Sequence, residues 1–375
     1  MIYTVFMFLC TVFGIAFASK ISNDKRTRIT YCTLSGLGLF LIAALRNISV
    51  GYDSGQYVHL FNYVSKCSIS TILTRYSKEP LFYISLKIIS LISNNSNFLF
   101  AVIGACFAFA VTYLIYKFSE IPYVSFVMLI PMQFFPFTLS GCRQAIAMSF
   151  VIVAIYTLIK RSYIKFFVIM FVAYFFHNSV IIALPILFLY LIKDKIISRI
   201  LFFVEFLLAY IYRYPLLKFI TTYIYTDYDI FDKEAGSLTT LFMYLAILIM
   251  SAVLVNGSFF RRRTTSNILK QNFESCAANG IDAYVVEKSI YRFFEVLLGV
   301  GIIIQIFVPL QPNIFRAAMY YQIASIIIVP KAITNIPNRI LRAISIMFFF
   351  LIMAILYFRF TFYSAGANPY LFFWQ

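Results

Sequence analysis

The 375-residue sequence is 62% hydrophobic and only 12% charged, with a formal net charge of +17 and a mean hydropathy of +0.88. Soluble domains are about half apolar and about a quarter charged, so this composition excludes an ordinary soluble protein and is typical of a multi-pass membrane protein. Lys and Arg in short membrane loops are topology signals that face anionic lipid, so the positive charge does not indicate a nucleic-acid partner, and we expect none.

Twelve apolar segments predict transmembrane helices, which need about 20 residues, although several of these segments are short. The predicted fold is all-α, a polytopic helical bundle that forms a single transmembrane domain over residues 1–375, because in lipid only helices or closed barrels satisfy their backbone. The apolar run between Lys165 and Lys193 is read as two short helices that turn at His177, with one kinked segment as the alternative. The expected spans are 1–18, 30–47, 98–116, 122–140, 143–159, 163–177, 178–192, 200–212, 238–256, 290–308, 316–334 and 340–358.

Basic residues orient these spans. With the N-terminus outside, nearly every basic cluster falls on the cytoplasmic side, as the positive-inside rule requires, and the C-terminus also lies outside. Two extracytoplasmic loops are then long, at about 46–97 and 213–237, and the cytoplasmic loop covers about 257–289. Within the first long loop, a short apolar run with Lys87 in its middle predicts an interfacial helix rather than a span. The cytoplasmic clusters include Lys20, Lys25, Arg26, Arg28, Lys117, Lys160, Arg161, Lys193, Arg261, Arg262, Arg263, Lys331, Arg339 and Arg342.

Ionisable and polar residues gather on the predicted outer face, where the positive-inside rule does not explain arginine. Ionisable groups near membrane depth usually face a protein interior or a wet cavity and indicate function. The stretch RNISVGYDSGQYVHLF contains several of them, and SGCRQAIA, FFHNS and FRAAMYY contribute others. The candidates are Arg46, Asp53, Tyr57, Glu79, Arg143, Gln144, His177, Arg316 and Tyr320.

Arg143 and Arg316 each begin a predicted helix, and Arg46 ends one. A helix N-terminus favours anions, and the planar guanidinium matches phosphate oxygens in a bidentate way. These arginines therefore predict a phosphate or pyrophosphate site, to which we assign Arg143 and Arg316 first and Arg46 second. The alternative is structural: the arginines contact lipid head groups or pair with Asp53 and Glu79.

Asp53 and His177 are the candidates for a general base that deprotonates a hydroxyl. The residues alone do not separate them, and Asp53 is only slightly preferred. Either residue has a structural alternative, in a turn or at a broken helix. Glu79, Tyr57 and Gln144 are secondary candidates, and Tyr320 is expected to stack on sugars or to join an interfacial aromatic belt.

Several classes of chemistry have no motif here. The sequence has no P-loop, no dinucleotide fingerprint, no H-E-x-x-H and no G-x-S-x-G, and its six cysteines are scattered. We therefore expect no cofactor and no metal, and a substrate that arrives already activated. Glu205 and the pair of Arg292 and Glu295 are the features that would support an ion or proton path, although a structural pair is the simpler interpretation.

The ordered set of motifs resembles the EpsG/Wzy group of bacterial polysaccharide polymerases. RNISVGYDSGQY is similar to the R-x-x-x-V-G-x-D-x-x-x-Y signature of that group, and EPLFY, RQAIA, the His of FFHNS and FRAAMYY follow in register over about residues 30–335. Two positions depart from the pattern. Ser54 replaces a more usual Thr, and the Asn that is common upstream of Arg143 is absent, so no role of that Asn can be transferred.

The resemblance implies an O-antigen or exopolysaccharide polymerase of GT-C-like fold on the periplasmic face of the inner membrane. In such an enzyme, a hydroxyl of one undecaprenyl-pyrophosphate-linked repeat unit attacks the anomeric carbon of the growing glycan, and undecaprenyl pyrophosphate leaves. A metal-independent glycosyltransferase of this kind needs no nucleotide sugar. The expected partners are the lipid-linked oligosaccharide, membrane lipid and a chain-length regulator. The alternatives are an O-antigen ligase, or a flippase or transporter of lipid-linked oligosaccharides.

Overall fold

The computed structural model describes the whole chain except residues 194–196, 224–237, 257–266, 275–282, 363–365 and 367. The described residues form helices and no named strand; one isolated bridge joins Arg46 to Phe372. The all-helical fold that the sequence predicts is therefore confirmed for this part of the chain.

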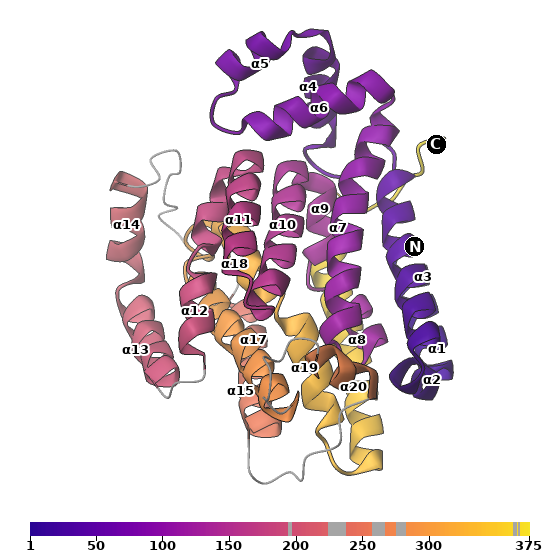
Figure 1. Cartoon of the computed structure of the whole chain (residues 1–375), viewed down its shortest axis with the longest axis vertical. Coiled ribbons are helices and arrows are strands. Elements are labelled where there is room, and N and C mark those ends of the chain that lie inside the picture. Colours follow the sequence, from indigo (N-terminus) through magenta and orange to yellow (C-terminus); the bar gives the residue numbers. More distant parts are fainter. Residues whose placement is uncertain (194–196, 224–237, 257–266, 275–282, 363–365, 367) are drawn as a thin grey trace.

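The N-terminal half contains three helices of 18 residues or more, α3, α7 and α10, with shorter helices between them (Figure 1). Its elements are α1 (Ile2–Ala16), α2 (Ala18–Asn23), α3 (Lys25–Ala44), α4 (Ser54–Lys66), α5 (Ile69–Arg75), α6 (Pro80–Ile92), α7 (Ser96–Phe118), α8 (Pro122–Met128), α9 (Phe134–Ser140), α10 (Cys142–Ile159), α11 (Tyr163–Phe176), the 3-10 helix η1 (Asn178–Ala183) and α12 (Ile186–Ile192).

The C-terminal half of the chain packs against the helices of the N-terminal half. Its elements are α13 (Ile197–Ile211), α14 (Arg213–Tyr223), α15 (Thr239–Asn256), α16 (Asn267–Glu274), α17 (Ala283–Gln305), the 3-10 helix η2 (Pro312–Ile314), α18 (Phe315–Gln322), α19 (Ser325–Thr334), α20 (Arg339–Leu356) and the π-helical turn η3 (Tyr357–Thr361).

Among the described residues, four helices are long and apolar enough to cross a membrane: α3, α7, α10 and the continuous segment Arg339–Thr361. The number rises to six if two bent pairs each count as one span. Other expected spans correspond to apolar helical segments of 10–17 residues, such as α1, α11 and Thr239–Leu254 of α15. The fold is thus that of a multi-pass membrane protein, with fewer full-length spans by this measure than the twelve expected from sequence.

The expected span 122–140 is broken into α8 and α9, and this correction has a local cause. Pro131 has no N–H for a helical hydrogen bond, and Gln133 adopts a left-handed conformation with φ of 66°. Pro136 then falls in the first turn of α9, where a missing N–H is tolerated. The whole segment is nevertheless buried almost throughout, so the apolar run lies inside the protein but is not the single continuous helix that was expected.

Three other expected boundaries change. Segment 316–334 is bent by 52° between α18 and α19, and α13 meets α14 at 81°, so the first part of the expected loop 213–237 is helical. The remainder of that loop, 224–237, lies outside the described residues. The expected cytoplasmic loop 257–289 contains α16 and the beginning of α17, while 257–266 and 275–282 also lie outside the described residues.

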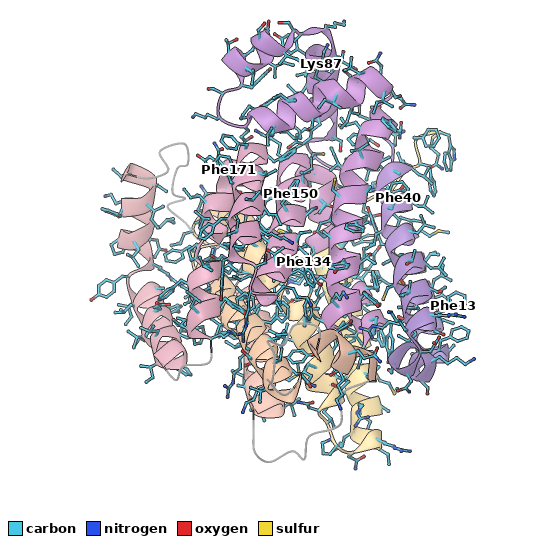
Figure 2. The ribbon with its side chains drawn as sticks, viewed as in Figure 1. Phe13, Phe40, Lys87, Phe134, Phe150 and Phe171 are labelled. Atoms are coloured by element: carbon cyan, nitrogen blue, oxygen red, sulfur yellow. The ribbon has the colours of Figure 1, made fainter. Side chains whose placement is uncertain are left out.

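The bundle is apolar outside as well as inside, as a membrane requires. Phe134 is fully buried, whereas Phe13 and Phe171 are more than half exposed on the periphery (Figure 2). Small residues allow α3 and α7 to approach closely: a Cβ added to Gly36 would lie 2.3 Å from Thr112 Oγ1. Close contact through small residues is typical of helices that pack in lipid.

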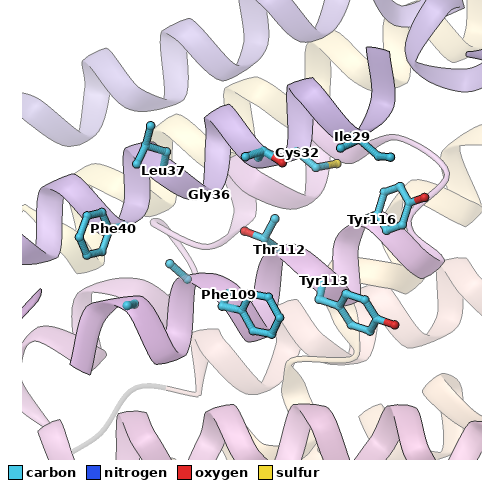
Figure 3. Close-up of a pocket in the computed structure, with 12 residues that line it drawn as sticks. Ile29, Cys32, Gly36, Leu37, Phe40, Phe109, Thr112, Tyr113 and Tyr116 are labelled. Atoms are coloured by element: carbon cyan, nitrogen blue, oxygen red, sulfur yellow. The ribbon is translucent and has the colours of Figure 1, made fainter. Parts of the chain in front are cut away.

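An apolar groove of about 490 Å³ runs between α3 and α7, flanked by Phe40, Phe109 and Tyr113 (Figure 3). No charged side chain lines it. The groove lies within two helices that are long enough to cross a membrane, so it suits a hydrocarbon chain and not a phosphate.

Helices α4, α5 and α6 form a cap over the end of the bundle opposite α2 (Figure 1). Phe61, Phe82 and Leu86 form an apolar cluster with Cys142 and Ala145 of α10, so the cap packs onto the N-terminal end of that helix. The cap thereby determines which residues meet where α10 begins. The segment for which the sequence predicts an interfacial helix forms α6, which is 13 residues long and buries Phe82, Leu86 and Ile89; its position at a membrane interface stays a prediction.

Candidate active site

Glu79 connects the cap to two helices of the bundle. It immediately precedes α6, whose first residue is Pro80, and its side chain is buried. Glu79 Oε2 accepts a hydrogen bond from Arg143 Nη1 at 2.7 Å, and Oε1 lies 2.7 Å from His177 Nδ1. The backbone N–H of Asn178 also donates to Oε1, at 3.1 Å. One carboxylate therefore holds an arginine and a histidine in fixed positions.

The local sequence explains why these side chains meet. Gly141 precedes α10, and Arg143 is the second residue of that helix. His177 ends α11 with an extended backbone, and the following 3-10 helix turns the chain so that the Asn178 N–H faces the same carboxylate. The beginnings of α6 and α10 and the junction between α11 and η1 thus meet at Glu79.

The electrostatics of this cluster favour an ionised carboxylate. Burial alone would raise the pKa of Glu79, but the hydrogen bond and charge of His177 and the charge of Arg143 outweigh it and lower the pKa to about 2. Because an ionised carboxylate only accepts hydrogen bonds, His177 Nδ1 must donate to it. When the imidazole is neutral, Nε2 then carries a lone pair that can accept a proton.

Tyr57 lies beside the same cluster. It is buried in the cap, its ring packs edge-on against Phe82, and it is close enough to Arg143 for an electrostatic interaction. Burial raises the pKa of Tyr57 to about 12, so its hydroxyl keeps its proton at neutral pH. Tyr57 can therefore donate a hydrogen bond near Arg143 but is not a base.

A cavity of about 400 Å³ contains two more of the predicted residues, Asp53 and Arg316. The Arg316 guanidinium lies over the ring of Phe137, 5.6 Å from its centre, and it has no carboxylate within ion-pair distance among the described residues. Gln144, next to Arg143 on α10, donates to the backbone carbonyl of Arg316 at 2.6 Å. This bond links the cavity to the Glu79 cluster through adjacent residues of one helix.

Arg46 is placed differently from the expectation. It is 2% exposed, with its guanidinium 3.9 Å from the centre of the Phe100 ring and hydrogen-bonded to the backbone carbonyl of Leu139. Arg46 Nη2 also lies 3.9 Å from the Cys142 sulfur. This placement favours a structural tie between α3, α7 and the α9–α10 turn over the expected contact with phosphate.

Tyr320 is also placed differently, because it is buried and neither joins an aromatic belt nor reaches a surface where sugars stack. Its hydroxyl lies 2.9 Å from Ser179 Oγ and connects α18 to η1. The aromatic pair that sequence analysis missed lies in the cap: the rings of Tyr76 and Tyr83 stack at 3.8 Å and 9°. Tyr83 is close enough to Arg143 and Glu79 to interact with both.

Glu79 was predicted only as a secondary candidate, yet it organises the cluster. Its position directly before Pro80 at the start of an apolar helix was a usable signal, since such a residue sits at a helix end with its side chain free to pair. Asn178 was missed because it contributes its backbone N–H, a group that every residue except proline carries. Among the described residues, no group of three or more His, Cys, Asp or Glu side chains is arranged to hold a metal ion.

Comparison with known proteins gives one family. The model of the EpsG family matches residues 29–372, nearly the whole chain and every residue of the cluster described above. No curated protein and no solved structure matches the chain. The match over this length shows that the chain belongs to the EpsG family.

Proposed function

We propose that the protein polymerises a bacterial polysaccharide, O-antigen or exopolysaccharide, from repeat units carried on undecaprenyl pyrophosphate, at the periplasmic face of the inner membrane. Membership of the EpsG family supports a polymerase-like glycosyltransferase in a membrane. The observation that carries the proposal is the joining of Arg143 and His177 by Glu79, beside a cavity that contains Arg316 and Asp53.

His177 is the proposed general base. With Nδ1 donating to Glu79, Nε2 takes the proton of the acceptor hydroxyl as its oxygen attacks the anomeric carbon of the donor glycan. A carboxylate that orients an imidazole and stabilises the imidazolium is a recurring arrangement in nucleophile activation. The geometry therefore supports His177 over Asp53 as the base, and Asp53 is assigned to positioning the acceptor across the cavity.

Arg316 is the proposed pyrophosphate ligand. As the anomeric carbon–oxygen bond breaks, negative charge develops on the undecaprenyl pyrophosphate that leaves, and a guanidinium without a carboxylate partner stabilises that charge. Arg143 shares its charge with Glu79, but its side chain is 39% exposed and retains donors for a second phosphate oxygen. We assign both arginines to the leaving group and omit Arg46.

The substrate's other parts have proposed positions as well. The stacked Tyr76 and Tyr83 offer an apolar face for a sugar ring close to Arg143, and the isoprenoid chain lies between helices.

The proposal also includes the topology expected from sequence, with about twelve membrane crossings and both termini periplasmic. It further includes a GT-C-like fold and a chain-length regulator as partner.

The test is the glycan ladder of a deletion strain complemented with matched amounts of wild type or variant protein. We expect His177→Ala and Arg316→Ala to give single-repeat or very short glycans. The controls are His59→Ala, which removes an exposed histidine from the cap, and Arg339→Ala, which removes an exposed arginine from α20. A normal ladder with both His177→Ala and Arg316→Ala would show that polymerisation needs neither residue, which would contradict the proposed active site.

The same strains separate the two alternative functions. A ligase predicts that the deletion strain still makes long glycan that stays unattached to its lipid acceptor. A flippase predicts that lipid-linked repeat units accumulate on the inner leaflet. A polymerase predicts one repeat unit, exported and attached, with no elongation.

A further inference from the structure

A second charged cluster is buried at the opposite end of the bundle, where the proposed reaction does not use it. Lys331 Nζ, near the end of α19, lies 2.9 Å from Glu120 Oε1 and 2.5 Å from Glu287 Oε1. All three residues are less than one-tenth exposed, and the ammonium also lies 4.9 Å from the centre of the Tyr291 ring. Burying charges is costly compared with apolar packing, so such a cluster is weak evidence for stability and points to another role.

A cavity of about 430 Å³ opens onto this cluster. Its walls are α2, the connection between α7 and α8, the end of α19 and the first two turns of α20. Glu120 and Lys331 line it on one side and Arg342 on another, with Ser19 and Asn335 between them. Because α2 and Lys331 belong to the basic, predicted cytoplasmic side, this cavity lies at the level of the inner-leaflet head groups.

Charges of both signs lie in and behind the cavity. Two carboxylates, Glu120 and Glu287, lie near Lys331 and Arg342, and the buried Arg28 guanidinium also interacts with Glu120. Glu120 uses Oε1 for Lys331, and its Oε2 accepts no hydrogen bond from the described residues. Arg342 donates through Nε and Nη2 to the Ile336 carbonyl, which leaves Nη1 for a ligand. The cavity therefore offers a negative acceptor at Glu120 and a positive donor at Arg342.

We propose that this cavity binds the head group of phosphatidylethanolamine from the cytoplasmic leaflet. The primary ammonium donates to Glu120 Oε2, and the phosphodiester accepts from Arg342. A choline head group has no N–H to donate, and an anionic phosphatidylglycerol head group would leave the Glu120 oxygen without a cation. The site therefore distinguishes phosphatidylethanolamine from both, independently of the reaction at the outer face.

The experiment is native mass spectrometry of the delipidated full-length protein, titrated with phosphatidylethanolamine, phosphatidylcholine or phosphatidylglycerol of identical acyl chains. We expect one phosphatidylethanolamine to bind about tenfold more tightly than either other lipid, since one charge-assisted hydrogen bond is at stake. Glu120→Gln and Arg342→Gln each should remove about tenfold of that affinity. Arg339→Gln, an exposed arginine on the same helix that does not line the cavity, is the control.

Equal affinity for the three lipids, tighter binding of phosphatidylglycerol, or cavity variants that bind like Arg339→Gln would overturn the proposal. Two cavity variants are used so that misfolding of one does not decide the result. Soluble glycerophosphoethanolamine should not compete at the concentration of the lipid; effective competition would show that a free phosphoethanolamine compound, and not a lipid, is the ligand.

Discussion

Glu79→Gln is the perturbation that most directly tests how the outer cluster works. Glu79 accepts from Arg143 at one oxygen and from both His177 and Asn178 at the other. A glutamine has one acceptor oxygen and one donor NH₂ group. If its oxygen faces His177, its NH₂ faces the Arg143 guanidinium, and if it is flipped, its NH₂ faces His177 Nδ1 and the Asn178 N–H. In either orientation a donor faces a donor.

The magnitude follows from these contacts. Each lost hydrogen bond to the charged carboxylate is worth about 1.5–3 kcal/mol, and a well-placed general base contributes about 10²–10⁴-fold to rate. If His177 is the base and Glu79 fixes its tautomer, Glu79→Gln should slow polymerisation at least about 100-fold. Arg143 is partly exposed, so water can replace part of what the carboxylate provides. The loss of folding stability should therefore be smaller than the sum of the lost hydrogen bonds, about 1–3 kcal/mol in total.

The assay measures glycan length in complemented deletion cells together with thermal unfolding of the purified variant in detergent. Glu205→Gln is the control, since it makes the same chemical change at an exposed position of α13. A Glu79→Gln protein that folds normally and still makes a wild-type ladder would refute the reasoning. An unfolded variant would be replaced by Glu79→Asp, whose shorter side chain cannot reach both partners and should give intermediate glycan lengths.

Three further predictions concern Arg316, the turn at Gly51 between α3 and α4, and the effect of pH on Glu79. Arg316→Lys should retain part of the activity and Arg316→Gln almost none, because Lys keeps the charge but not the bidentate fork, and glycan ladders check this. Gly51→Ala should lower the free energy of unfolding by about 1–3 kcal/mol, because Gly51 has φ of +98° and an added Cβ would lie 2.3 Å from the Leu139 carbonyl oxygen. Gly55→Ala is the control, because an added Cβ there would meet nothing within 4 Å. Equal thermal unfolding of the two variants would contradict this prediction. The pKa of Glu79 in the folded protein, about 2, lies below its ordinary value of 4.5. The stability that the ionised carboxylate contributes is therefore present above pH 4.5 and is lost as the pH falls toward 2. The difference in free energy of unfolding between wild type and Glu79→Gln, measured with denaturant, should shrink over that interval.

The sequence predicted where apolar helices lie better than where they break. Hydrophobic runs mark buried or lipid-facing segments whatever the backbone does, so 122–140 was recognised as an apolar segment but was expected to form one helix. Its break at Pro131 and Gln133 depends on whether neighbours satisfy the freed backbone groups, and that is a tertiary property. The bend between α18 and α19 has no such clear residue signal, which is why one straight helix was expected there.

The outer site was predicted as a set of residues but not as a set of contacts. The positive-inside rule singled out Arg143 and Arg316 because they stood on the wrong side for topology. The same argument selected Arg46, which is instead buried against Phe100, since charge and position along the chain do not reveal what a side chain packs against. The pairing of Glu79 with His177 joins residues 98 apart in sequence, and no local pattern specifies it.

The most direct measurement of the central claim is a reconstituted reaction. The purified protein in liposomes would receive one synthetic undecaprenyl-pyrophosphate-linked repeat unit, and both polymer length and released undecaprenyl pyrophosphate would be measured. The account predicts one undecaprenyl pyrophosphate released for each new glycosidic bond with wild type and His59→Ala, and neither product with His177→Ala or Arg316→Gln. Polymer formation by the two site variants at the wild-type rate, or no polymer from the wild-type protein under conditions where it is folded, would contradict the account.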